Sequence, residues 1–158
     1  MTPSWRDLLA NPAHLLAFGL GSGLSPRAPG TAGTVVAALA WWLLGPLSLW
    51  AHLVILLLLI AVGTWVAGRT ARDLGVHDHG GIVIDEWAGF WLAVTALPHH
   101  WVWLLAGFAL FRLFDIAKPW PIGWLDRRVH GGWGIMLDDL IAGLFAWLIL
   151  FGAFVALG

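Results

Sequence analysis

The chain has 158 residues, of which 60% are hydrophobic and only 11% are charged. An average soluble domain is about 25% charged, so this composition indicates an integral membrane protein with a single domain that covers residues 1–158. The absence of cysteine excludes a thiolate nucleophile and cysteine-based metal sites, and a net charge of −1 gives no reason to expect nucleic acid as a partner.

Apolar runs and their interruptions predict an all-α fold, a polytopic membrane helical bundle. The first stretch, Leu8–Leu20, is broken by Asn11, Pro12 and Gly19, so we expect an N-terminal interfacial helix there. About five short membrane helices are expected from the runs Val35–Leu49, Leu53–Ala67, Ile82–Leu97, Trp101–Phe114 and Leu140–Leu157. Each run is shorter than the ~20 residues that a span usually needs.

The charged residues predict the orientation of this bundle. With five spans, all eight Lys and Arg residues fall on one side of the membrane, and all nine acidic residues fall on the same side. Basic residues favour the cytoplasmic side of membrane proteins. We therefore expect the chemistry of the protein to face the cytoplasm, at the level of the lipid head groups.

Two acidic doublets inside apolar sequence, Asp85-Glu86 and Asp138-Asp139, are the clearest signals of function. Carboxylates at membrane depth are costly unless they are paired or bind a cation. Adjacent helical residues point about 100° apart, so two helix ends brought together could provide up to four carboxylates. Oxygen ligands favour a hard ion such as magnesium. The alternative is two helix N-termini at which the helix dipole favours acidic residues.

A concentration of cations lies between the doublets. Arg112, Asp115 and Lys118 recur every three residues and share one helical face before a proline ends the helix, and Arg127-Arg128 follow. These cations could offset the charge of a substrate phosphate. The alternative is a positively charged flank that binds anionic lipid.

Two further motifs are weaker. The segment GLGSGLSPRAPGTAGT precedes an apolar helix and could bind an anion through its backbone N–H groups, with Thr31 and Thr34 as helix caps or phosphate ligands. It could equally be a flexible entry loop, and it is not a P-loop, because no GKS or GKT follows. His77, Asp78 and His79 are expected to support the site rather than to bind a metal, since too few imidazoles lie nearby for a zinc site.

Together these motifs resemble the phosphatidylglycerophosphatase A family. The matching segments are GSGLSPRAPGTAGT, HDHGGIVIDEWAGF and FRLFDIAKPWPIGWLDRRVHGGWGIMLDDLIAG. The resemblance implies a magnesium-dependent phosphoric monoester hydrolase of the bacterial inner membrane. Such an enzyme would convert phosphatidylglycerophosphate to phosphatidylglycerol and phosphate in phospholipid biosynthesis. The family pattern does not by itself assign a role to each acid.

On this interpretation the site residues fall into three groups. The expected metal ligands, for one or two magnesium ions, are Asp85, Glu86, Asp138 and Asp139. The expected phosphate-binding residues are Thr31, Thr34, Arg112, Lys118, Arg127 and Arg128. The expected catalytic residues are Asp85, Asp115 and Asp139. Asp115 is a base, a nucleophile that forms an aspartyl-phosphate, or a support paired with Arg112.

Other classes of membrane protein predict different patterns. A CDP-alcohol phosphotransferase would carry a DGxxAR…GxxxD…D arrangement, which is missing here. A transporter or channel would carry charges midway along its spans. An assembly factor without activity would tolerate alanine at Asp138. The main alternative function is that of a magnesium-dependent phosphotransferase or phosphatase acting on another lipid phosphate.

Overall fold

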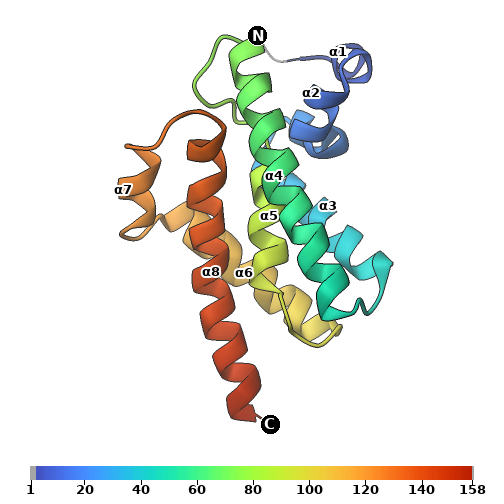
Figure 1. Cartoon of the computed structure of the whole chain (residues 1–158), viewed down its shortest axis with the longest axis vertical. Helices are drawn as coiled ribbons and strands as arrows, with labels where there is room; N and C mark the ends of the chain where they lie inside the picture. The colour runs from blue at the N-terminus through green and yellow to red at the C-terminus, as the bar shows by residue number, and fades with distance from the viewer. Residues whose placement is uncertain (1–2, 158) are drawn as a thin grey trace.

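The computed structural model describes residues 3–157, and every regular element in that range is a helix, as the sequence predicts (Figure 1). Three short elements come first: α1 (Trp5–Ala10), α2 (Pro12–Ala17) and the 3-10 segment η1 (Gly19–Leu24). The remaining helices are α3 (Pro29–Leu44), α4 (Leu49–Asp73), α5 (Ile84–Ala93), α6 (Trp101–Ala117), α7 (Ile122–Asp126) and α8 (Gly131–Leu157).

The N-terminal region differs from the single interfacial helix expected over Leu8–Leu20. The Asn11 side chain accepts a hydrogen bond from the Ala13 N–H, so Asn11 caps a second short helix that begins at a proline. Leu8 and Phe18 are fully buried, and they pack with apolar residues of α4. This region therefore covers the end of the bundle that is at the top of Figure 1, beside the C-terminal half of α4.

Within residues 3–157, two helices are long and apolar enough to cross a membrane, α4 with 25 residues and α8 with 27. Helices α3 and α6 are shorter, with 16 and 17 residues. Helix α5 has only 10 residues, a rise of about 15 Å, which is half the thickness of a typical hydrocarbon core. The apolar run Ile82–Leu97 therefore forms a half-length helix rather than a full span.

Side chains from α4 and α8 allow α5 to end inside the bundle. His52 Nε2 lies 3.0 Å from the Trp91 carbonyl oxygen, and the Thr95 hydroxyl donates to the same oxygen. Trp147 Nε1 donates to the Thr95 carbonyl at 2.9 Å. Buried carbonyls at a helix end are costly without partners. These contacts give the carbonyls of Trp91 and Thr95 their hydrogen-bond partners.

Helices α5 and α8 run in the same direction and touch through their backbones (Figure 1). A Cβ on Gly143 would collide with the Gly89 carbonyl, and a Cβ on Gly89 would lie 2.7 Å from the Asp139 carbonyl. Glycines allow helices to approach this closely. Because Asp85 and Asp139 each lie one turn before these glycines, the contact brings the two acidic residues together.

Candidate active site

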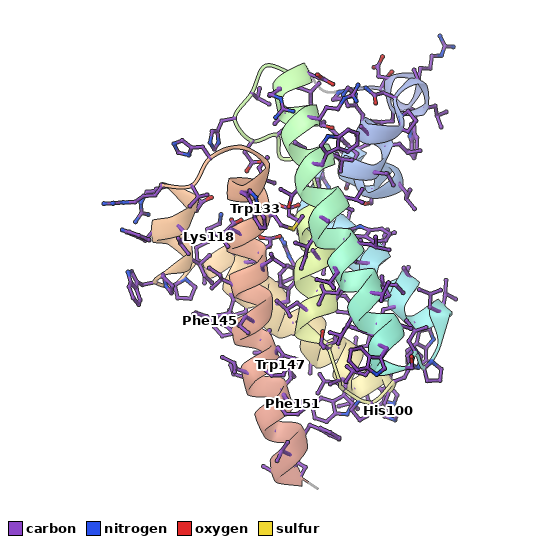
Figure 2. All side chains as sticks on the ribbon, viewed as in Figure 1. His100, Lys118, Trp133, Phe145, Trp147 and Phe151 are labelled. Atoms are coloured by element: carbon purple, nitrogen blue, oxygen red, sulfur yellow. The ribbon has the colours of Figure 1, made fainter. Side chains whose placement is uncertain are left out.

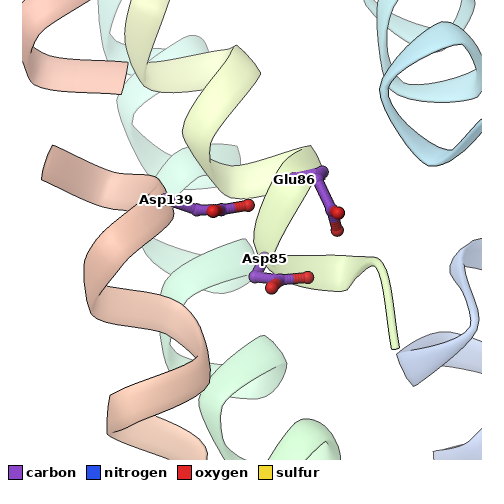
Figure 3. A group of neighbouring side chains, drawn as sticks. All are labelled: Asp85, Glu86 and Asp139. Carbon is purple, nitrogen blue, oxygen red and sulfur yellow. The ribbon is translucent and has the colours of Figure 1, made fainter. Parts of the chain in front are cut away.

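Three of the four expected metal ligands come together. One carboxylate oxygen from each of Asp85, Glu86 and Asp139 lies within 4.8 Å of the other two (Figure 3). We call these three residues the carboxylate centre. Asp85 and Glu86 belong to the first turn of α5, whereas Asp139 lies about two turns inside α8. Only 2% of Asp139 and 9% of Asp85 is exposed.

The carboxylate centre has the donor set of a cation site. Within the described residues, Asp85 Oδ1, Glu86 Oε2 and Asp139 Oδ2 are buried and have no hydrogen-bond partner. Unpaired buried carboxylates are costly, and three together also repel one another. A hard divalent cation such as magnesium takes oxygen ligands and would remove both costs. The residues present therefore fit the ion that the sequence motifs imply.

Arg112 of α6 is the buried cation beside this centre. Its Nη1 pairs with Asp115 on the same helix and lies 3.8 Å from Glu86 Oε1. Its Nη2 donates to the hydroxyl of Thr31 in the first turn of α3 at 3.3 Å. The side chains of Arg112, Asp115 and Glu86 are only 12–14% exposed. Arg112 therefore links α3, α5 and α6, and Thr31 contacts this guanidinium.

Asp138, the fourth expected ligand, binds a lysine instead. Its Oδ2 accepts a hydrogen bond from Lys118 Nζ at 2.7 Å, and Lys118 also pairs with Asp126 of α7 at 3.2 Å. Lys118 therefore lies between α7 and α8 (Figure 2). Burial alone would lower the pKa of Lys118, but its hydrogen bonds to Asp138 and Asp126 outweigh burial and raise that pKa. Lys118 stays charged, and it also attracts the carboxylate of Asp78.

The contact between α5 and α8 is shifted by one residue relative to the alignment of their acidic doublets. This shift explains why Asp138 lies outside the carboxylate centre. The segments GIVIDE and GIMLDD align Asp85 with Asp138. The backbone contact of Gly89 with Gly143 instead places Asp85 level with Asp139. Neighbouring helical residues point about 100° apart, so Asp138 faces α7 and Lys118 while Asp139 faces α5. The small residues, not the acidic doublets, set the register of these helices.

The glycine-rich segment before α3 supports α5. A Cβ on Gly23 would collide with the Gly81 carbonyl, and a Cβ on Gly33 would lie 2.6 Å from the Val83 side chain. The buried Thr34 hydroxyl donates to a carbonyl of its own helix at 2.8 Å. The segment packs against the chain that leads into α5, and Thr34 is engaged within α3.

His77, His79 and the arginine pair have contacts outside the carboxylate centre. His79 Nδ1 accepts a hydrogen bond from the backbone N–H two residues later, which orders the loop before α5. His77 packs edge-on against His130, with ring centroids 4.6 Å apart. Arg127 and Arg128 are exposed, and the Arg128 guanidinium lies over the neighbouring Trp124 ring.

The fold and the site define a helical protein with two membrane-length apolar helices and a buried cluster of carboxylates and cations. The phosphatidylglycerophosphatase A family model matches residues 15–154, and the chain belongs to this family. The resemblance seen in the motifs is thus confirmed.

Three relatives match most of the chain. Phosphatidylglycerophosphatase A of Escherichia coli is 49% identical over 92% of this chain and 86% of its own length. Phosphatidylglycerophosphatase A of Haemophilus influenzae is 45% identical, over 94% and 93%. A putative phosphatidylinositol-3-phosphatase of Bacteroides thetaiotaomicron is 37% identical, over 86% and 89%. No solved structure matches the chain.

Proposed function

We propose that this protein removes the terminal phosphate of phosphatidylglycerophosphate to give phosphatidylglycerol in phospholipid biosynthesis. Membership of the phosphatidylglycerophosphatase A family supports phosphatidylglycerophosphate as the substrate. The observation that carries the chemistry is the carboxylate centre, whose unpartnered oxygens lie in a buried site next to Arg112. Hydrolysis of a phosphate monoester is very slow without a catalyst, so strong neutralisation of phosphate charge is required.

Magnesium is the cofactor we propose, with Asp85, Glu86 and Asp139 as its ligands. When bound, it would offset phosphate charge and lower the pKa of an attacking water. Arg112 keeps Glu86 in place and would add positive potential at the phosphate. Asp115 is engaged by Arg112, which favours a supporting role over that of a nucleophile. Lys118, with about a third of its side chain exposed, is the cation best placed to meet an incoming phosphate.

Phosphate release by the purified protein tests the function directly. We expect release from phosphatidylglycerophosphate in detergent with magnesium and none after chelation, with activity restored when magnesium is added back. Phosphatidylinositol 3-phosphate serves as the competing substrate, because one relative carries the name of its phosphatase. Faster release from the inositol lipid would contradict the proposed substrate. Undiminished release in chelator would contradict the proposed cofactor.

Lys118→Ala should separate recognition of the phosphate monoester from general attraction to lipid. The product lacks the monoester but keeps its phosphodiester, so a contact with the monoester weakens binding of the substrate far more than of the product. We expect about a tenfold weaker substrate affinity and slower turnover, in line with a lost charge-assisted hydrogen bond. Affinities for both lipids in one detergent measure this. Equal weakening would make Lys118 a lipid anchor.

We propose that the protein lies in the bacterial inner membrane as a multi-pass protein with its carboxylate centre towards the cytoplasm. The loop after α4 and the turn before it lie at opposite ends of that helix (Figure 1). In this cysteine-free chain, Arg72→Cys should react with a membrane-impermeant thiol reagent only in inside-out vesicles. The control Ser48→Cys should react from the periplasmic side. Labelling of position 72 from the periplasmic side would show that the orientation is the reverse of the one we propose.

A further inference from the structure

An apolar groove of about 420 Å³ lies between α3 and α6. Four side chains of α3, from Val35 to Trp42, and four of α6, from Trp101 to Phe108, line it, and all are Val, Ala, Leu, Trp or Phe. Ala38 has the smallest side chain of this lining. The groove is therefore a place for a flexible hydrocarbon rather than for a polar ligand.

The upper end of the groove lies one helical turn from Thr31 and Arg112, which flank the carboxylate centre. The Thr31–Arg112 hydrogen bond joins α3 and α6, and the two helices run in opposite directions. Val35 follows Thr31 by four residues, and Phe108 precedes Arg112 by four. One helical turn, about 5 Å, thus separates the buried guanidinium from the first apolar residues of the groove. The polar site and the groove are therefore neighbours along the same two helices.

Packed aromatic rings lie at the lower end, next to the lining residue Trp42. The His99 ring stacks on Trp42 with ring centroids 4.8 Å apart and also lies against Trp41. His99 Nε2 lies 3.3 Å from the Trp41 carbonyl oxygen, which holds the imidazole in place. From Val35 to Trp42 the groove extends about 10 Å along α3. It is long enough for the first part of an acyl chain, with the rest passing into the bilayer.

We propose that this groove binds one acyl chain of the phospholipid whose head-group phosphate lies at the carboxylate centre. The inference rests on the proposed lipid-phosphatase function. It assigns Val35, Ala38, Leu39 and Phe108 as residues that position the lipid substrate. A chain held here fixes the glycerol backbone near Thr31 and Arg112 and so restricts the positions available to the phosphate. The tail runs from the polar end of the bundle towards its opposite end, as it does in a membrane leaflet.

Filling the groove should weaken use of lipid but not of its head group. Ala38→Leu adds bulk to the groove, whereas Ala40→Leu, the control, makes the same change on α3 outside it. Two substrates are compared, dioleoyl phosphatidylglycerophosphate and its deacylated, water-soluble counterpart. We expect Ala38→Leu to raise KM for the dioleoyl lipid about tenfold, by overpacking. Its activity on the deacylated compound and all activities of Ala40→Leu should change less than twofold.

A photolabelling experiment on the unaltered protein does not depend on how the variant folds. Phosphatidylglycerophosphate and phosphatidylethanolamine, each with the same diazirine-bearing acyl chain, are bound in chelator and irradiated. We expect the first lipid to label the peptides of α3 and α6 several times more strongly. Equal labelling would mean that bulk lipid fills the groove and would overturn the inference. Equal losses on both substrates in Ala38→Leu would also overturn it.

Failure of the acyl-chain site can be distinguished from failure of the proposed function. If the unaltered protein uses the deacylated and dioleoyl substrates with the same KM and kcat, the acyl-chain site is refuted while the phosphatase function stands. If it releases phosphate from neither compound, the proposed function itself fails.

Discussion

Replacing Asp139 with asparagine should reduce phosphate release on the order of a thousandfold, because a ligand and a charge are lost from the carboxylate centre. The adjacent Asp138→Asn provides the matched control, since Asp138 bonds Lys118 and lies outside the group of three. Its activity should fall by only about tenfold, the size of effect expected for a supporting residue. Initial rates at saturating magnesium measure both losses.

Thermal unfolding provides a second test of the Asp139→Asn variant that does not depend on activity. Asparagine at position 139 relieves repulsion within the carboxylate centre, so the Tm without metal should stay the same or rise. In the unaltered protein added magnesium should raise the Tm, and in Asp139→Asn that increase should be lost. A larger loss of activity in Asp138→Asn than in Asp139→Asn would show that Asp138, and not Asp139, acts with Asp85 and Glu86.

Replacing Arg112 with methionine should have the largest effect on stability. The substitution leaves Glu86 and Asp115 buried without their cation, and breaking a buried pair in this way typically costs about 3 kcal/mol or more. The control is Arg69→Met, whose partner Asp73 and own side chain are nearly half exposed, so that pair contributes at most about 1 kcal/mol. Denaturant unfolding in detergent measures the free energy of unfolding of both variants.

Arg112→Lys refines this test. Lysine keeps the positive charge but cannot bridge Asp115, Glu86 and Thr31 at once, because it lacks the planar fork of the guanidinium. We expect it to recover part of the lost stability and little of the activity. A free energy of unfolding equal in Arg112→Met and Arg69→Met would show that Arg112 does not hold the three helices together.

The sequence was sufficient to predict the all-helical fold and the main components of the site. Apolar periods with few charges indicate helices in a membrane, and a carboxylate in such surroundings needs a partner. That argument selected Asp85, Glu86, Asp138 and Asp139, and the structure brings all but Asp138 together. The three-residue spacing likewise predicted that Arg112 and Asp115 share a helical face, and they form an ion pair.

The features that the sequence did not reveal depend on tertiary contacts. Helix α8 begins at Gly131, although glycines are poor helix formers, so Asp139 lies well inside a helix and not at its end. The length of α5 depends on side chains of two other helices, His52 and Trp147, which no local pattern reports. The separation of Asp138 from Asp139 depends on a helix register that is set four residues later.

The backbone contact between Gly89 and Gly143 also limits the size of the ion that the proposed metal site could hold. It fixes how far Asp85 can lie from Asp139, and calcium needs oxygen ligands at about 2.3–2.6 Å, whereas magnesium needs them at about 2.0–2.1 Å. A methyl group at Gly89 would push the helices apart and enlarge the cage in one direction. For the magnesium site that we propose, two residues without side chains would thus set the spacing that favours magnesium over calcium.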